Sequence, residues 1–126
     1  MKLASIPKAR CVLGLIAILA GGCSGEVAPP KPIAVEQAPS TLGEAFKTAK
    51  PEAKKLADDA VAALGAKDYT KALFALQSLA SRSDLTPEQR DIASRSMLAV
   101  NKALAEQANS GDQQAQQTLQ FQRSTK

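Results

Sequence analysis

The sequence predicts an all-α protein: a small antiparallel bundle of three to four helices behind an export signal and a proline-rich tether. Two observations carry this fold class. Apolar residues recur at the three-and-four spacing of one helix face between residues 51 and 108, and helix-start signals precede each of these runs. No convincing strand is present. With 126 residues, the chain has room for one small folded domain and no second core.

Residues 1–22 follow the three-part pattern of an export signal. A basic start is followed by an apolar run over residues 11–20 and by two glycines. Ten apolar residues rise about 15 Å as a helix, half of a ~30 Å hydrocarbon core, so the pattern favours a signal peptide over a transmembrane span. The basic residues are Lys2, Lys8 and Arg10.

The stretch Leu19-Ala20-Gly21-Gly22-Cys23 resembles the lipobox of bacterial lipoproteins, in which small residues precede a cysteine that receives diacylglycerol before the signal is removed. The resemblance covers about the first 24 residues. It departs from the commonest pattern at Ala20, where leucine is usual, and at Gly21, where alanine or serine is usual. The resemblance implies that Cys23 is the lipid attachment site and the first residue of the mature chain.

The alternative is an ordinary secretory signal cut at the same bond, because Ala20 and Gly22 also satisfy the small-x-small rule. Since Cys11 leaves with the signal, Cys23 then has no partner for an intramolecular disulfide, and lipidation explains a solitary cysteine better. In Gram-negative lipoproteins an aspartate after the cysteine directs retention in the inner membrane. Ser24 stands there, so the resemblance implies the outer membrane, facing the periplasm.

The net charge of +4 does not indicate a nucleic-acid partner. Three of the 16 Lys and Arg residues precede Cys23, which leaves 13 against 12 acidic residues and a net charge of +1. Nucleic-acid binding also needs a clustered basic face or stacking aromatic residues. The aromatic residues beyond the signal are few and scattered among mixed charges: Phe46, Tyr69, Phe74 and Phe121.

Residues 23–41 are expected to be the lipidated cysteine and a tether. Residues 24–40 hold four of the seven prolines, few large apolar residues and no periodicity, a composition that cannot build a core. A polyproline-like segment rises ~3.1 Å per residue, so this stretch would hold the helical domain, residues 42–126, up to roughly 50 Å from the lipid.

The domain begins with a short helical piece, for which Thr41 and Glu44 have capping-box spacing. Pro51 interrupts it and suits the first position of a helix that we expect to end at Leu64. The apolar face of this second helix comprises Ala53, Leu56, Ala57, Ala60, Val61 and Leu64.

A break at Gly65–Asp68 separates this helix from the next, which we expect from Tyr69 to about Arg82 with Asp68 as its cap. The short link favours an antiparallel hairpin that buries both apolar faces. The second face comprises Tyr69, Ala72, Leu73, Leu76, Leu79 and Ala80, and Phe74 lies off it. Phe74 is therefore expected either to face solvent or a second chain, or to pack beneath the helix that begins at Pro87 or beneath the short helix around Phe46.

Thr86-Pro87-Glu88-Gln89 is the clearest helix start, with a cap, a first-turn proline and a capping-box glutamine. The helix is expected to run to about Ala108 and to stop at Asn109-Ser110-Gly111, which completes a core over residues 51–108. Its buried side comprises Ile92, Ala93, Met97, Val100, Ala103 and Leu104. The glutamine-rich tail, residues 112–126, has only Ala115, Leu119 and Phe121 to bury. It is therefore expected to form either a weak fourth helix or a frayed end.

The hairpin resembles a tetratricopeptide repeat, and Asp68-Tyr69 followed by Ala72 is the best-matching piece. The match covers about 30 residues, and it departs from the repeat at Asp59, where leucine is preferred, and in lacking a closing proline. A generic helical hairpin is the alternative. Such arrays need three or more units, and about one and a half are present, which implies exposed apolar surface at an open end. The other matching positions are Leu56, Ala60, Ala63, Leu73, Leu76 and Leu79.

The residue types exclude the common catalytic sites. The chain has no histidine, the usual general base and a frequent metal ligand. Asp58 and Asp59 are adjacent and diverge by about 100° on a helix, so with Lys54 and Lys55 they indicate a solvated charged face. We expect no enzymatic activity, no metal, no cofactor and no small-molecule substrate.

These observations predict a non-enzymatic, membrane-anchored envelope lipoprotein that binds an envelope protein or itself as an interaction or scaffold module. The alternative is a structural lipoprotein linked to the cell wall through Lys126, because Braun-type murein lipoproteins join their terminal lysine to peptidoglycan. That family is one long heptad helix, which Pro87 and Gly111 would break here.

Overall fold

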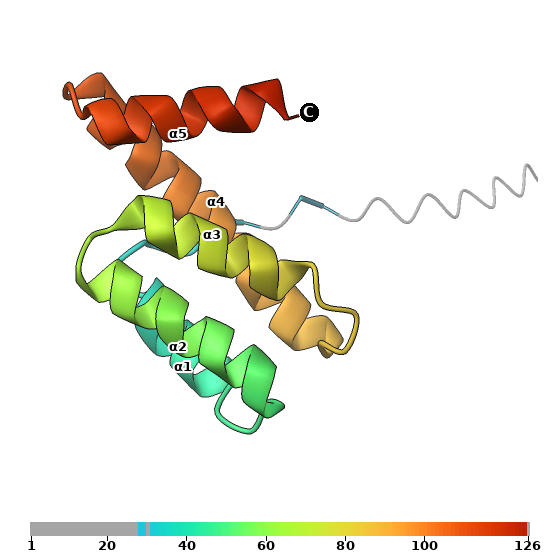
Figure 1. Ribbon diagram of the computed structural model, residues 1–126. Helices are drawn as coiled ribbons and strands as arrows, with labels where there is room; N and C mark the ends of the chain where they lie inside the picture. Colours follow the sequence, from blue (N-terminus) through green and yellow to red (C-terminus); the bar gives the residue numbers. More distant parts are fainter. Residues whose placement is uncertain (1–27, 30, 126) are drawn as a thin grey trace, which may run out of the picture.

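A computed structural model describes residues 28–29 and 31–125 of the chain. Over these residues the structure contains five α-helices and no strand (Figure 1). The expected all-α class is therefore confirmed. The helices are α1 (Ala38–Ala45), α2 (Pro51–Gly65), α3 (Tyr69–Ala80), α4 (Pro87–Asn109) and α5 (Gln113–Ser124).

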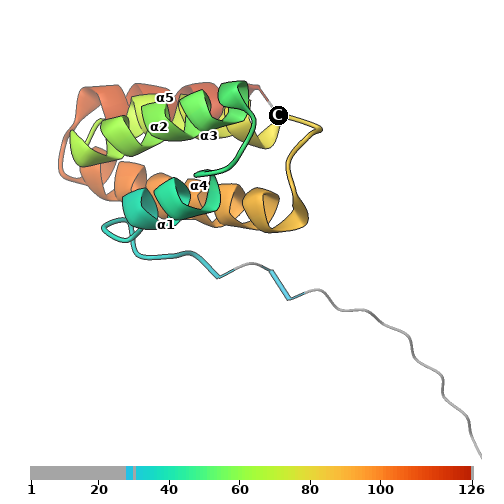
Figure 2. The same cartoon turned by 90° about the horizontal axis from the view of Figure 1, so that it is seen from below.

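The first four helices form a closed ring of neighbours. Helix α1 packs against α2 and α4, and α3 packs against the same two helices, whereas α2 and α4 do not approach each other. Helix α5 lies on α4 and touches α3 more lightly. Figure 2 shows the resulting two layers, with α1 and α4 in one and α2, α3 and α5 in the other.

The core lies between these layers and is rich in alanine. Helix α2 buries four alanines and Leu64, and such small side chains let neighbouring helix backbones approach closely. Leu56 and Ile92, which the sequence placed in the core, are only partly buried. They lie at the edges of their apolar stripes. The largest fully buried side chains are Phe46, Leu42, Leu73, Leu76, Leu79, Leu104 and Val100.

Three helices begin where the sequence predicts. Pro51 occupies the first turn of α2. The Asp68 carboxylate accepts a hydrogen bond from the Lys71 backbone N–H (3.0 Å) at the start of α3. At α4 the Thr86 hydroxyl accepts from the Gln89 N–H and the Gln89 side chain accepts from the Thr86 N–H, both at 3.1 Å. These signals are local, so the sequence alone fixes where the three helices begin.

The start of α1 corrects the sequence interpretation. The capping box expected from Thr41 and Glu44 is not formed, because Thr41 lies inside the helix and its hydroxyl donates to the Gln37 carbonyl (2.9 Å). The helix begins at Ala38, and Ala38 and Leu42 are both fully buried. Burial of these two side chains outweighs the local cap signal. The folded part therefore starts before residue 42, inside the stretch expected to be a tether.

The break between α2 and α3 is centred on Lys67 and not on Gly65. Gly65 is still helical, while Lys67 has a left-handed φ of 57°. The Lys67 and Asp68 N–H groups donate to the carbonyls of Leu64 and Ala63, at 3.0 and 2.9 Å. This is the Schellman pattern, which satisfies the last carbonyls of a helix and reverses the chain.

The glutamine-rich tail forms the helix α5, which decides between the two alternatives left open for it. Gly111, with a φ of 99°, ends α4, and the Asp112 N–H donates to the Gln107 carbonyl (3.0 Å). The Asp112 carboxylate then accepts from the Ala115 N–H (3.0 Å) and caps α5. Phe121, expected among the residues to be buried, is 57 % exposed.

Candidate functional site

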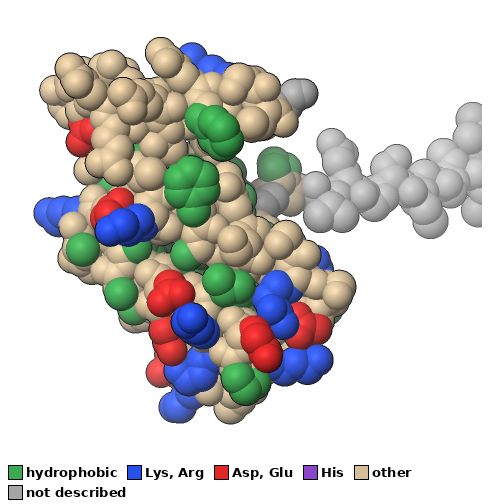
Figure 3. All heavy atoms as spheres, in the orientation of Figure 1, with side chains coloured by type: hydrophobic (Ala, Val, Ile, Leu, Met, Phe, Trp, Pro, Cys, Tyr) green, Lys and Arg blue, Asp and Glu red, His purple; other side chains and the backbone are tan. Residues whose placement is uncertain are grey.

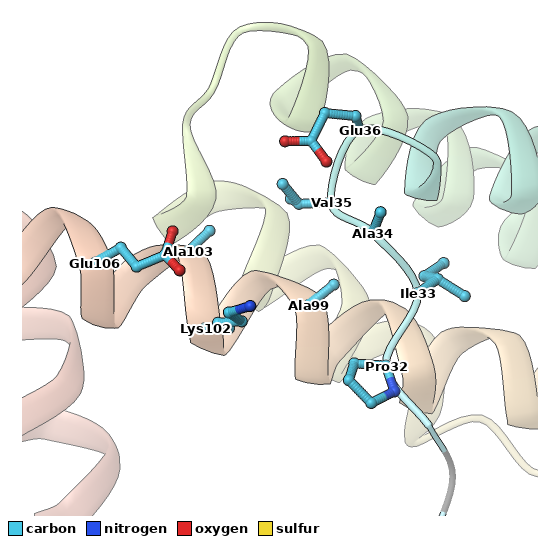
Figure 4. Close-up of a pocket in the computed structure, with 9 residues that line it drawn as sticks. All are labelled: Pro32, Ile33, Ala34, Val35, Glu36, Ala99, Lys102, Ala103 and Glu106. Atoms are coloured by element: carbon cyan, nitrogen blue, oxygen red, sulfur yellow. The ribbon is translucent and has the colours of Figure 1, made fainter.

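The two attachment points expected from the sequence, Cys23 and Lys126, lie outside the described residues. The described residues begin at position 28, however, and show how the stretch that precedes α1 meets the helices. Residues 31–37 cross α4 on their way to α1, irregular over residues 31–34 and forming a turn at residues 35–37 (Figure 4). The Arg95 side chain donates from Nε to the Lys31 carbonyl (2.8 Å), and Ile33 and Val35 are partly buried against the core.

A shallow open hollow lies where this segment passes over α4. Figure 4 shows Pro32, Ile33, Ala34 and Val35 on the segment, with Lys102 and Glu106 on the helix beside them. The lining offers one lysine and two glutamates on an otherwise apolar wall.

A cluster of three charged side chains joins the loop before α2 to the loop after α3. Arg82 donates to the Asp84 carboxylate from Nε (3.0 Å) and Nη2 (2.9 Å), and Lys50 Nζ lies 3.4 Å from the same carboxylate. The hydrogen bond from Arg82 is the main cause that lowers the pKa of Asp84 to about 2. Lys50 directly precedes α2, whereas Arg82 and Asp84 follow α3. The cluster therefore stabilises the hairpin at its open end.

Two aromatic side chains are exposed on neighbouring helices. Phe74 of α3 is 45 % exposed and Phe121 of α5 is 57 % exposed, while Phe46 is buried. Of the alternatives for Phe74, the structure therefore shows a side chain facing outwards. Thr70 and Thr118 join the two helices by a hydrogen bond of 3.0 Å between their hydroxyls. This contact could not be predicted from local sequence patterns, because the two residues are 48 positions apart.

The helices that carry these aromatic residues are almost free of charge. Helices α3 and α5 have one charged residue each, Lys71 and Arg123, whereas α2 has five and α4 has six. In Figure 3 the charged side chains gather over α2 and the loop after α3, while hydrophobic side chains show along the seam between α3 and α5. We call this seam the neutral face; the Thr70–Thr118 hydrogen bond joins its two helices, and its exposed aromatic residues are Phe74 and Phe121.

Comparisons of the chain with protein-family models, with curated proteins and with solved structures give no match. Within residues 28–29 and 31–125, no group of three or more Cys, Asp or Glu side chains lies close enough to hold a metal ion. In the same part of the chain, no helix combines the length and the apolar character that crossing a membrane requires.

Proposed function

We propose that the protein is a bacterial envelope lipoprotein, anchored through Cys23 to the outer membrane on its periplasmic side. Its helical domain serves as a non-enzymatic interaction or scaffold module. The observation that carries this proposal is the signal pattern of residues 1–22 followed by a cysteine that has no second cysteine for a disulfide once the signal is removed.

The contact between residues 31–37 and α4 sets how far the domain can stand from the anchor. Because Lys31 is already hydrogen-bonded to Arg95, only the eight peptide steps from Cys23 to Lys31 separate the lipid from the domain. An extended chain covers at most about 3.6 Å per residue, so these steps reach at most about 29 Å. This proposed tether is shorter than the ~50 Å expected from proline content alone, and it holds the domain close to the membrane.

Because α1–α4 form a closed ring, the exposed apolar surface that the sequence predicts at the open end of a repeat stack lies elsewhere. We retain the tetratricopeptide resemblance as a proposal for the α2–α3 hairpin only. Helices α1 and α4 cover the sides of this hairpin by packing against each other as well as against α2 and α3. The exposed aromatic residues therefore lie on the neutral face and not at the open end of a repeat stack.

Detergent phase separation and membrane fractionation test the anchor and its destination. We expect the wild-type protein in the detergent phase and in the outer-membrane fraction, and Cys23→Ser outside the detergent phase or uncleaved. By the same resemblance, Ser24→Asp should move the protein to the inner membrane, while the matched control Ser24→Ala should not. A wild-type mature protein in the aqueous phase would contradict the proposal.

A further inference from the structure

We propose that residues 31–33 form a releasable strap on α4, which leaves the helix as a unit while all five helices stay folded. Ala34 is the hinge of this motion. In the proposed lipoprotein, release lengthens the reach of the domain from its anchor. That consequence rests on the proposed function, whereas the motion itself does not.

The strap lies over a side of α4 that is separate from the core of the bundle. Ala99 and Ala103 of α4 are 4 % and 6 % exposed, yet neither belongs to the continuous apolar core that the other buried side chains of this helix join. Both line the hollow that Ile33 also lines, and Figure 4 shows the Ala99 side chain pointing from α4 toward the strap. The strap is therefore part of what keeps Ala99 from water.

Few contacts hold the strap in place. Within residues 28–29 and 31–125 it takes part in one hydrogen bond, from Arg95 Nε to the Lys31 carbonyl, and that bond is exposed to water. Arg95 also has a second partner, since its Nη1 lies 3.6 Å from the Asp91 carboxylate, so the guanidinium stays paired after release. Ile33 is only partly buried, beside a hollow of about 280 Å³. An exposed hydrogen bond and sparse apolar contacts are typical of segments that open locally.

Ala34 separates the strap from a turn that belongs to α1. The Ala34 carbonyl accepts hydrogen bonds from the N–H groups of Gln37 (2.9 Å) and Ala38 (3.1 Å). Ala38 is fully buried at the start of α1. The turn is therefore fixed to the helix, and release is limited to the residues before it.

Release changes the reach by three peptide steps. Eight steps join Cys23 to Lys31 while the strap is docked, and eleven join Cys23 to Ala34 once it is free. At most about 3.6 Å per residue is covered, so the limit rises from about 29 to about 40 Å. Pro32 favours an extended backbone at the residue before it, so the free strap stays extended. The domain can thus move outward by up to about 11 Å without loss of a helix.

Thiol labelling of the purified full-length lipoprotein in detergent tests the release. Each variant carries one introduced cysteine, and peptide mass spectrometry reads the maleimide label at that position. Ala99→Cys reports the strap, Val100→Cys reports opening of the core, and Leu98→Cys, at a side chain that is 41 % exposed, gives the rate of an open site. We expect Ala99→Cys to react about tenfold or more slower than Leu98→Cys, and about tenfold or more faster than Val100→Cys.

Loss of the Arg95 contact should act on the strap alone. Arg95→Ala should raise the labelling rate of Ala99→Cys about threefold or more and leave the rate of Val100→Cys unchanged. The second rate separates release of the strap from a loss of overall stability. Arg90→Ala is the matched control, because it removes an exposed arginine of the same helix, and it should change neither rate.

Three results would overturn the proposal. Ala99→Cys reacting as fast as Leu98→Cys would show that the strap is not docked. A rate as slow as that of Val100→Cys, or a rate that Arg95→Ala does not raise, would show that the strap does not release by itself. A labelled thiol at Cys23 in the same digests would instead count against the lipid anchor and leave the motion standing.

Energy transfer to a membrane tests the longer reach. The donor dye is placed on Ala62→Cys, at an exposed position of α2, and the protein is inserted into vesicles of phosphatidylethanolamine and phosphatidylglycerol that contain an acceptor lipid. Addition of Arg95→Ala should lower the transfer, whereas Arg90→Ala should not. Equal transfer in both variants would overturn the change of reach.

Discussion

Thr70 of α3 and Thr118 of α5 share a hydrogen bond of 3.0 Å that fastens the C-terminal helix to the bundle. Thr118 is 7 % exposed, and its hydroxyl also donates to the Gln114 carbonyl (2.8 Å). With that proton committed, the Thr70 hydroxyl is the donor of the bond between the two helices. The other buried side chain of α5 is Ala115, and the helix packs mainly on α4, so this polar contact adds a link from α5 to α3.

Thr118→Val should loosen α5 without changing the volume of the side chain. The substitution removes the acceptor of Thr70, and loss of one such hydrogen bond costs about 1 kcal/mol. Amide hydrogen exchange should accelerate in α5 first. Thr125→Val is the control, because the Thr125 hydroxyl is exposed and bonds only within its own turn. Equal protection of α5 in wild type and Thr118→Val would contradict the role of this bond.

Leu76→Ala should lower the free energy of unfolding by about 2–5 kcal/mol, because Leu76 is fully buried at the centre of the core and its truncation leaves a cavity. Leu98→Ala removes the same atoms from a side chain that is 41 % exposed, and its cost should be much smaller. Thermal unfolding followed by circular dichroism compares the two variants. Equal melting temperatures for both would show that the core is placed wrongly.

Two glycines should respond to alanine in opposite directions. A Cβ atom would meet nothing within 4 Å at either Gly65 or Gly111, so sterics with neighbours do not decide the effect. Gly65 is helical, and alanine there should stabilise the protein by about 0.5–1 kcal/mol. Gly111 has a φ of 99°, where alanine should destabilise by about 1–2 kcal/mol. Chemical denaturation measures both, and a shared sign would contradict the described backbone.

Acid should remove the contribution of Asp84 to stability. Its pKa is lowered from 3.8 to about 2 in the folded protein, so the folded state favours the charged form. The stabilisation is complete above the unfolded value of 3.8 and is lost as the pH falls towards 2. The melting temperatures of wild type and Asp84→Asn should therefore differ at pH 7 and converge as the pH falls from 3.8 to about 2. A constant difference across this range would contradict the ion pair.

Local signals made α2, α3 and α4 predictable. A first-turn proline, the Asp68 cap and the Thr86–Gln89 capping box each lie within four residues of the helix start that they specify. Their apolar stripes follow the helical period, so the side of each helix that is buried could also be predicted. Phe74 lies off its stripe, for which the pattern left exposure and packing both open, and the structure shows it exposed.

The start of α1, the position of α5 and the neutral face depend on contacts between residues that are distant in the sequence, so local patterns did not predict them. Thr41 and Glu44 have the spacing of a cap, yet burial of Ala38 moves the start of α1 ahead of them. Helix α5 has few apolar residues; it packs on α4 and is joined to α3 by the hydrogen bond from Thr70 to Thr118. The neutral face likewise needs two helices brought together, so neither α3 nor α5 reveals it by periodicity alone.

Mass spectrometry of the mature N-terminus tests the proposed function most directly. The proposal predicts that the first residue is Cys23 and that its thiol carries a diacylglyceryl group, with the preceding 22 residues removed. Chain cleavage elsewhere, or an unmodified thiol at Cys23, would contradict it.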